Sequence, residues 1–203
     1  TNRNPVLDPI GNRSITEGDS LGLTVTASDP DGEIPVLTTS VLPSNAAFTD
    51  NLDGTGTLVF LPDFTQNGTH EITFYASDGS SADSELVTIT VADAGNQPPV
   101  LDSIGTRIVS EGATLNIAVT ASDPDGTIPA LSAVNLPLNA TFADNGDGTG
   151  SFQFIPDFTQ AGSYDVTFIA SDGVMADSEL VLITVQELGN QAPIIDSIGP
   201  QTV

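Results

Sequence analysis

The sequence predicts an all-β fold built from tandem antiparallel β-sandwiches of about seven strands each. Three observations support this: the chain repeats itself at a fixed offset, its apolar residues alternate with polar ones, and glycine- and aspartate-rich turns separate the alternating segments. No segment has the 3.6-residue spacing of apolar positions that an amphipathic helix requires. Short strands at this density are typical of a sandwich.

The repeat is marked by one short motif that occurs three times. PVLDPIG at 5–11 returns as PVLDSIG at 99–105 and as PIIDSIG at 193–199, with an offset of 94 residues both times. With that shift, roughly 55 of the 94 aligned positions are identical. We therefore expect two full repeats and the beginning of a third, as part of a longer array. The predicted boundaries are 1–94, 95–188, and 189–203 for the linker and first strand of the third repeat.

Within a repeat, strand and turn signals follow one another in chain order. In residues 20–28, Leu21, Leu23, Val25 and Ala27 alternate with small or polar residues, which is the period of a half-buried strand. The later strands are rich in Thr, Val, Ile and Phe, which suit a pleated sheet. Asp-Gly sequences supply the turns. The expected strands include 20–28, 55–60, 70–77 and 84–91, and the expected turns lie at 30–32, 52–56 and 77–79.

One feature favours an immunoglobulin-like sandwich. Tyr164 follows Gly162 just before an expected strand, where such folds carry a tyrosine whose hydroxyl bonds the backbone. His70 occupies the same position in the first repeat and is the single histidine of the chain. A lone histidine could act as a base. Because its counterpart is a tyrosine, we expect both side chains to be structural.

Composition excludes several classes of function. The chain has 27 acidic and three basic residues, no cysteine, and a formal net charge of −24. Such a chain has no basic surface for nucleic acid, and no apolar run is long enough for membrane insertion. The beginning of the chain contains no signal peptide, so targeting was removed or the chain is a piece of a longer protein. One histidine and no cysteine or lysine leave no constellation for catalysis, and we expect no enzymatic activity.

The acids recur at fixed positions. Each acid of the second repeat falls on an acid of the first, although roughly four positions in ten differ. On a salt-adapted surface only the total number of acidic residues matters. Such a surface therefore predicts that acids change position between the two copies. The recurrence favours a specific role, and the partners of so acidic a chain are cations.

Strand direction predicts where these acids meet. Loops of a sandwich collect at two ends. We call the end where the chain enters a repeat its incoming end and the opposite one its outgoing end. The outgoing end of the first repeat and the incoming end of the second are joined by a few residues. The predicted ligands at this junction are Glu17, Asp63, Asp93, Asn96, Asp123, Asp125 and Asp172. The corresponding sets are Asn2, Asp29, Asp31 and Asp78 before it, and Glu111, Asp157, Glu187 and Asn190 after it.

Calcium is the predicted cofactor at these positions. Two unit charges about 4 Å apart repel by about 4 kcal/mol at an effective dielectric constant of about 20. Ca²⁺ removes that repulsion because it accepts six to eight carboxylate, amide and carbonyl oxygens. Zn²⁺ prefers nitrogen and sulfur ligands, which are missing from this set. In each SDPDG sequence, residues i and i+2 of an extended segment face the same side.

These residues resemble the cadherin-like repeats of bacterial surface proteins, close to their immunoglobulin-like and dystroglycan-type groups. Glu17 and Glu111 match the early glutamate of that pattern, SDPDG matches its Asp-x-Asp pair, and ASDG, with Asp78 and Asp172, is similar to a later motif. The resemblance implies calcium at each junction, an extracellular location at the cell surface, and adjacent repeats as partners. The linkers, DAGNQPP and ELGNQAP, depart from the family pattern and imply fewer or weaker ions.

Two alternatives stay open at this point. The segments DNLDG and DNGDG resemble parts of a calcium-binding loop, but their register fails and a hairpin turn fits better. The chain is predicted to be a calcium-stiffened structural repeat of a surface fibre, stalk or adhesin. The alternative is a module that binds polysaccharide or other copies of itself. The scarcity of aromatic residues disfavours a sugar site, although Phe64 and Phe158 lie in loops.

Overall fold

The computed structural model describes residues 2–189. The chain forms two compact units, the first comprising residues up to 97 together with 124–126 and the second comprising 98–123 and the residues from 127 onward. Each unit consists of strands, turns and loops, and the part of the chain described contains no helix that could cross a membrane. The exact repeat boundaries stay a prediction.

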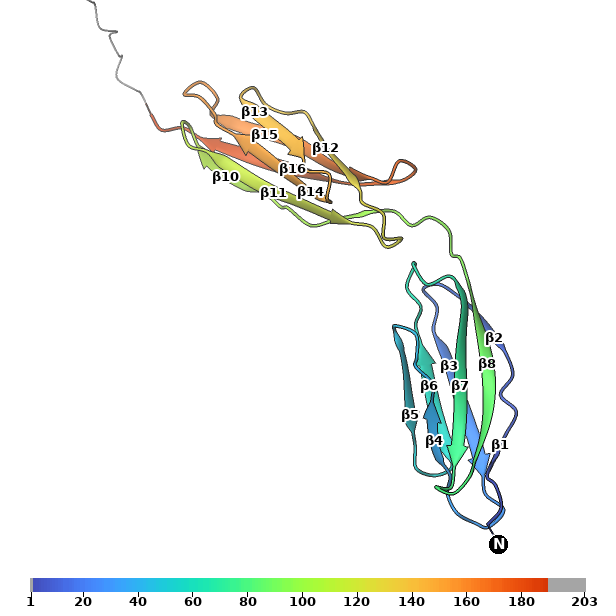
Figure 1. The fold of residues 1–203 in the computed structure, drawn as a ribbon. Coiled ribbons are helices and arrows are strands. Elements are labelled where there is room, and N and C mark those ends of the chain that lie inside the picture. The colour runs from blue at the N-terminus through green and yellow to red at the C-terminus, as the bar shows by residue number, and fades with distance from the viewer. Residues whose placement is uncertain (1, 190–203) are drawn as a thin grey trace, which may run out of the picture. The chain divides into compact units, whose positions relative to one another are not determined.

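The first unit is a sandwich of two four-stranded sheets (Figure 1). One sheet has the order β1-β3-β6-β5, and the other has the order β2-β8-β7-β4. The strands are β1 (Val6–Leu7), β2 (Arg13–Thr16), β3 (Leu21–Ser28), β4 (Val36–Thr39), β5 (Ala46–Asp50), β6 (Thr55–Phe60), β7 (Gly68–Ser77) and β8 (Ala82–Ala92).

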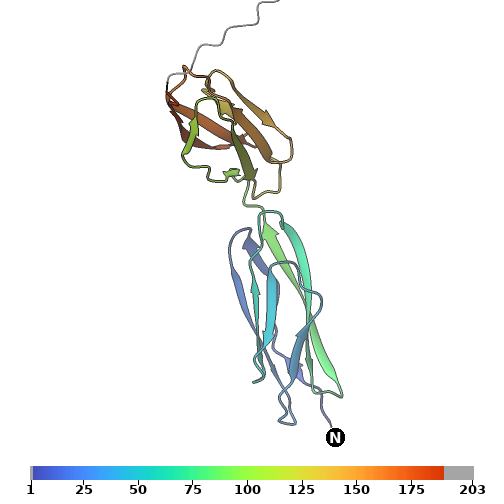
Figure 2. The ribbon, with the colours of Figure 1, turned by 90° about the vertical axis from the view of Figure 1, so that its left-hand side faces the viewer.

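The second unit repeats this topology strand for strand, and its two layers are seen from another side in Figure 2. Its sheets have the orders β9-β11-β14-β13 and β10-β16-β15-β12. The strands are β9 (Val100–Leu101), β10 (Arg107–Ser110), β11 (Leu115–Ser122), β12 (Ala130–Val134), β13 (Ala140–Asp144), β14 (Thr149–Phe154), β15 (Gly162–Ser171) and β16 (Ala176–Gln186).

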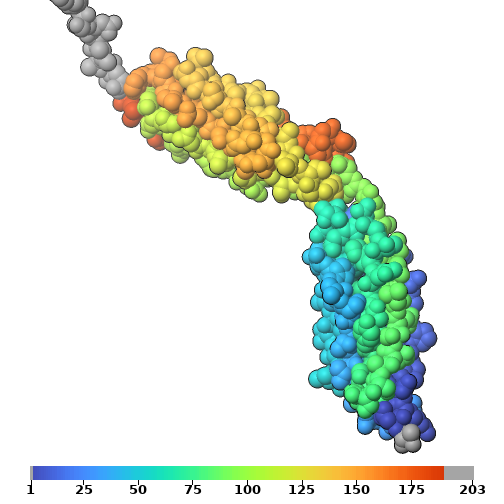
Figure 3. All heavy atoms as spheres, in the orientation of Figure 1, coloured from blue at the N-terminus to red at the C-terminus, as the bar shows by residue number. Residues whose placement is uncertain are grey.

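The predicted alternation places the core between the two sheets of each unit. In β3, Leu23, Val25 and Ala27 are buried, whereas the residues between them are exposed. Phe60, on β6 of the same sheet, and Phe74, on β7 of the opposite sheet, are fully buried in the same core. Figure 3 shows the outer surface of the chain with all heavy atoms drawn. Each repeat therefore has a core of its own, and the predicted all-β sandwich fold is confirmed.

Each unit differs from the prediction in having eight strands and one parallel pair. The beginning of the repeat is divided between the two sheets: β1 pairs antiparallel with β3, and β2 pairs parallel with β8. The second unit does the same with β9 and β10. Gly11, at φ 69°, and Gly105, at φ 70°, lie in the segments that cross between the sheets. Left-handed backbone is accessible to glycine at little cost.

Carboxylates hold these crossing segments. Glu85 accepts hydrogen bonds from the N–H groups of Ile10 (2.8 Å) and Gly11 (2.7 Å), and Asp83 accepts one from Leu7 (2.9 Å). In the second unit, Leu101 donates to Asp177, and Ile104 and Gly105 donate to Glu179, at 2.6–2.9 Å. We call Asp83 with Glu85, and Asp177 with Glu179, the carboxylate clamps. Leu7 and Leu101 end their strands, whereas the other donors lie in the crossing segments outside the sheet ladders, so these bonds satisfy backbone N–H groups that no neighbouring strand serves.

The structural roles predicted for Tyr164 and His70 are confirmed. The Tyr164 hydroxyl donates to the carbonyl of Gln160 at 2.9 Å, four residues earlier in the chain. His70 Nε2 lies 2.8 Å from the carbonyl of Gln66 at the matching place. Both rings also pack edge-on against a buried phenylalanine, Phe154 and Phe60 respectively.

Leu52, at the tip of the β5–β6 hairpin, is expected to destabilise the first repeat. Its φ is 63° and its side chain is 74% exposed, whereas the second repeat has Gly146 there, at φ 77°. Left-handed backbone costs a residue with a Cβ atom about 1–2 kcal/mol, which exceeds the entropic cost of glycine. Leu52→Gly should therefore stabilise the first repeat by about 0.5–1 kcal/mol in urea unfolding.

The second repeat supplies the reciprocal control. Gly146→Leu should destabilise that repeat by about 1 kcal/mol. A loss of stability on Leu52→Gly would show that the leucine makes a stabilising contact that outweighs its backbone strain.

Candidate metal-binding site

The incoming end of the first repeat brings the predicted ligands into contact. Asn2 Nδ2 donates to Asp78 Oδ2 at 2.8 Å, and the N–H of Arg3 donates to Asp31 Oδ2 at 2.6 Å. Asp29 Oδ1 accepts from the N–H of Asp31 at 2.7 Å. The guanidinium Nε of Arg3 lies 3.8 Å from Asp31 Oδ1. Two consecutive residues of the entering chain thus contact both acidic loops.

Asp78 is also held by its own turn. Its Oδ1 atom accepts from the N–H groups of Ser80 and Ser81, each at 2.7 Å. The hydrogen bond from the backbone of Ser81, followed by that from the Asn2 side chain, holds the pKa of Asp78 well below its usual range. This carboxyl group is therefore ionised at any physiological pH.

The second repeat reproduces these turns at its incoming end. The N–H of Gln97 donates to Asp125 Oδ2 at 2.6 Å, as Arg3 does to Asp31. Asp172 Oδ1 accepts from the N–H groups of Val174 (2.7 Å) and Met175 (2.6 Å). Asp123 is half-buried, like its counterpart in the first repeat.

The outgoing end of the first repeat contains a buried carboxylate that is incompletely satisfied. Glu17 is only 6% exposed. Its Oε2 atom accepts from the N–H of Ala94 at 3.2 Å, but its buried Oε1 atom has no hydrogen-bond partner. A hollow of about 250 Å³ is lined by Glu17 and Phe64 together with Asp93 and Asn96 of the linker. An unsatisfied buried acceptor is rare, because it loses its hydration without compensation.

The equivalent glutamate of the second repeat is satisfied by the protein. Glu111 is 2% exposed, and it accepts from the N–H of Ala161 at 3.1 Å and from that of Leu188 at 3.2 Å. The two outgoing ends therefore differ. Both carboxylate oxygens of Glu111 accept a hydrogen bond from a backbone N–H, whereas only one oxygen of Glu17 does.

Asp63 and Asp157 have a turn role that sequence reasoning did not predict. Asp63 Oδ1 accepts from the N–H and the hydroxyl of Thr65, and its Oδ2 accepts from the amide of Asn45. Asp157 repeats this with Thr159 and Asn139. The threonine hydroxyl is the main cause that lowers the pKa of each aspartate. With both oxygens engaged, these two residues are weaker candidates for ligands than Glu17.

The remaining predicted ligands are dispersed. Asp93 Oδ1 accepts from the N–H of Gly95 at 2.7 Å, Glu187 is exposed, and Asn190 lies outside the described residues. Within residues 2–189 the structure has no ready-formed group of three or more His, Asp or Glu side chains that could hold a metal ion. The calcium ligand set stays a prediction.

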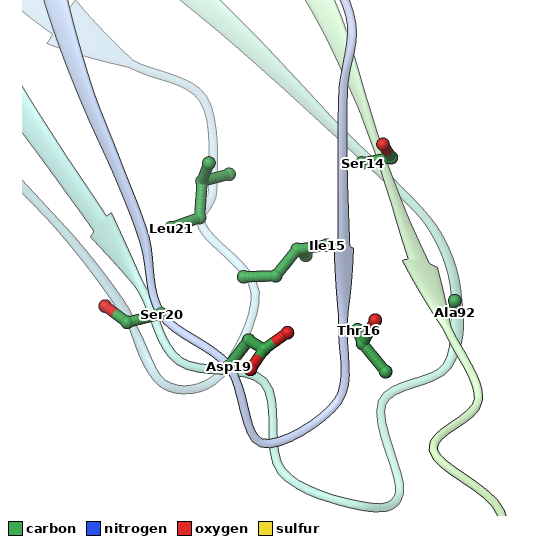
Figure 4. A pocket seen from close by; sticks show the side chains of 7 residues that line it. All are labelled: Ser14, Ile15, Thr16, Asp19, Ser20, Leu21 and Ala92. Atoms are coloured by element: carbon green, nitrogen blue, oxygen red, sulfur yellow. The ribbon is translucent and has the colours of Figure 1, made fainter.

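A second hollow, of about 490 Å³, lies beside β2 of the first repeat (Figure 4). Its lining combines the hydroxyl groups of Ser14, Thr16 and Ser20 with one carboxylate, Asp19. None of its lining residues is a predicted metal ligand and none is aromatic. We assign it no chemistry, because hydroxyl groups and a single carboxylate specify neither a metal nor a sugar ring.

The donor set at the outgoing end of the first repeat fits a hard divalent cation. Glu17 offers a buried carboxylate oxygen without a partner, and Asp93 and Asn96 offer carboxylate and amide oxygens along the same hollow. Oxygen donors of this kind suit Ca²⁺ and leave Zn²⁺ without its preferred ligands.

Comparison with known proteins gives the following matches. The sequence model of the bacterial Ig domain family matches residues 2–90 and 96–184. Chitinase A of Pseudoalteromonas piscicida is 25% identical over 197 residues, which is 96% of this chain and 23% of the chitinase. Protocadherin Fat 4 of Mus musculus is 27% identical over 142 residues, 61% of this chain and 3% of the protocadherin. The chain thus spans less than a quarter of the length of either relative.

Among solved structures, an endo-fucoidan hydrolase from glycoside hydrolase family 107 matches with a TM-score of 0.48 and 22% identity, over 91% of this chain and 29% of the hydrolase. The titin domains Z1Z2, solved in complex with telethonin, match with a TM-score of 0.40 and 15% identity, over 93% of this chain and 100% of theirs.

Proposed function

Because the chain belongs to the bacterial Ig domain family, in two tandem copies, we propose that it is an extracellular structural repeat of a bacterial surface fibre, stalk or adhesin, stiffened by Ca²⁺. The resemblance predicted from its motifs is confirmed by this family match. Tandem domains of this kind are typical of surface and adhesion proteins, which supports the location. The binding of Ca²⁺ is more specific than the extracellular location, and this part of the proposal rests on the side chains at the outgoing end of the first repeat.

The observation that supports calcium most directly is the buried Oε1 atom of Glu17, which has no partner. A buried carboxylate oxygen needs either a hydrogen-bond donor or a cation to offset its lost hydration. No lysine exists in the chain, and the three arginines are Arg3, Arg13 and Arg107. Arg13 donates to carbonyls beside its own strand, and so does Arg107. We therefore propose that a cation from solution supplies the positive charge beside Glu17.

The proposed mechanism follows from the charges at one end of a repeat. Without the ion, the carboxylates of Glu17 and Asp93 line one hollow at the outgoing end of the first repeat and repel each other. When bound, Ca²⁺ would supply positive charge to these oxygens and so stabilise the end of the repeat from which the linker leaves. Glu17 would hold it from within the first repeat, and Asp93 and Asn96 from the linker. A ligand that binds the folded state stabilises it by about 2.7 kcal/mol at one hundred times its Kd.

Removal of calcium tests this proposal. We expect EDTA to lower the melting temperature of the chain and Ca²⁺ to restore it, with Mg²⁺ much less effective because it requires a smaller octahedral site. Glu17→Gln should abolish most of the difference between Ca²⁺ and EDTA. Glu71→Gln is the matched control, because it removes the same charge from an exposed position on β7. A melting temperature that is equal in Ca²⁺ and EDTA would overturn the proposal.

We propose no catalytic role for these domains. The bacterial Ig fold is typically non-catalytic, and the acids described above serve turns, backbone donors and the candidate cation site. The activities named for the chitinase and the fucoidan hydrolase belong to proteins of which this chain spans less than a third.

The alternative function is binding to polysaccharide or to other copies of the chain. One observation favours it: Phe158 is 53% exposed in its loop, where a ring could cover a sugar. Binding to an insoluble polysaccharide, measured with and without Ca²⁺, would separate this function from a purely structural one.

A further inference from the structure

The outer side of one sheet in the second repeat carries a band of exposed apolar side chains. This sheet has the order β10-β16-β15-β12, and along each strand every second side chain points away from the core. Four large apolar side chains lie on the outer side and are 40–64% exposed. We call these four residues the apolar face: Ile108, Val134, Leu180 and Leu182.

Strand pairing brings the members of the apolar face together. Thr167 of β15 lies opposite both Val134 of β12 and Leu180 of β16, so these three residues form one row across the sheet. Leu182 follows Leu180 on the same side of β16, and Ile108 of β10 stands beside the next outward position of that strand. Direct and diagonal neighbours on one side of a sheet lie within about 8 Å of each other. The apolar face is therefore one continuous patch.

The first repeat has hydroxyl groups at three of these four positions, 94 residues earlier in the chain: Ser14, Ser40 and Thr88. The fourth position is a leucine in both repeats, Leu86 and Leu180. The first repeat forms the same sheet with hydroxyl groups at these positions, so the fold itself does not require the apolar side chains. A contiguous exposed apolar patch is typical of an interaction surface.

We infer that the apolar face is a contact surface for the same face of a second copy of the chain. Each copy carries a formal net charge of −24, so two copies repel each other wherever their acids meet. Among the outward-facing residues of the four strands, Asp165 is the one acid. The outer side of the opposite sheet is polar on its two central strands, where Gln153 donates to Asn116 at 3.1 Å. The apolar face thus combines little charge with apolar side chains that pairing can bury, as in sheets that pack face to face.

The size of the sheet determines how strong this contact can be. With strands about 4.8 Å apart and residues about 3.4 Å apart, four strands of these lengths present about 500 Å². Two copies would therefore bury about 1,000 Å², which is at the lower limit for a specific interface. We expect a weak, reversible dimer. Many copies on one surface would strengthen it by multivalency. That last step rests on the proposed function as a surface repeat, whereas the dimer itself is independent of calcium.

Sedimentation of the intact chain over a range of concentrations, in EDTA, tests the inference. We expect a monomer–dimer equilibrium that shifts toward the dimer as NaCl is added, because salt screens the repulsion between acidic copies and leaves the apolar contact in place. Ile108→Ser combined with Leu182→Thr introduces the residues of the first repeat. This double variant should raise the Kd of the dimer by about tenfold or more. Because both side chains are exposed, its urea unfolding midpoint should equal that of the original chain.

Leu86→Thr is the matched control, because it removes an exposed leucine from the corresponding sheet of the first repeat. Its dimer Kd should stay within about twofold of the original value. A chain that is monomeric at every concentration and salt level would overturn the inference, and so would a dimer that the double variant leaves unchanged. A dimer that forms only with Ca²⁺, or that weakens as NaCl is added, would show that charges join the copies and would also overturn it. The effect of EDTA on the melting temperature tests the proposed function separately.

Discussion

Replacing Glu179 with alanine is expected to destabilise the second repeat by about 2–4 kcal/mol. The two oxygens of this carboxylate accept the N–H groups of Ile104 (2.7 Å) and Gly105 (2.6 Å) in the segment that crosses between the sheets. Alanine leaves both donors without their charged acceptor, and hydrogen bonds to charged groups contribute more than neutral ones. Urea unfolding of the whole chain measures the loss, and hydrogen exchange of the two amides locates it.

Glu179→Gln provides the graded control, because it keeps one carbonyl oxygen and should lose less. Glu85→Ala should have the same effect on the first repeat, where Ile10 and Gly11 are the donors. If Glu179→Ala unfolds at the original urea concentration, water serves these amides equally well and the carboxylate clamp contributes no stability.

Replacing Phe168 with alanine is expected to cost the second repeat about 3–5 kcal/mol. The ring is fully buried and packs edge-on against Phe142 and Phe152, with ring centroids 5.7 Å and 5.5 Å away. Its removal leaves a cavity that two sheets held at a fixed separation cannot close. Such a loss is a large part of the roughly 5–15 kcal/mol that holds an ordinary domain folded.

Phe158→Ala is the matched control, since this ring is 53% exposed and its removal should cost less than about 1 kcal/mol. Because the two repeats have separate cores, the first repeat should unfold at its original urea concentration in both variants. A loss below about 1.5 kcal/mol for Phe168→Ala would show that the core of the second repeat collapses around the missing ring.

Most of the fold was predictable because its signals are local. The alternation of Leu23, Val25 and Ala27 identifies the core face of β3 without knowledge of any partner strand. The parallel pairing of β2 with β8 was not predictable in this way, since it joins residues about 76 positions apart through a crossing segment of irregular backbone. Pro9 and Gly11 mark that segment in the sequence, but they do not show to which sheet the following strand goes.

The candidate site was predictable in part. At the incoming end of the first repeat, Asn2 contacts Asp78 and Arg3 contacts Asp31, and the ligand role of these acids stays a prediction. Retention of acids between repeats was a less specific signal than expected. Asp83, Glu85 and Asp63 recur in the second repeat and serve backbone or turn donors. A carboxylate that accepts a backbone N–H has the same sequence pattern as one that binds a metal, and only the surrounding contacts separate them.

The parallel pairing of β2 with β8 affects how a repeat resists a stretching force applied to its two ends. In each repeat the chain enters at one end and leaves at the other, so traction on the termini draws these two strands in opposite directions along their length. The ladder from Arg13–Ile89 to Thr16–Ala92 then resists as a unit. Its bonds must rupture together, whereas a hairpin pulled at its open ends unzips one bond at a time.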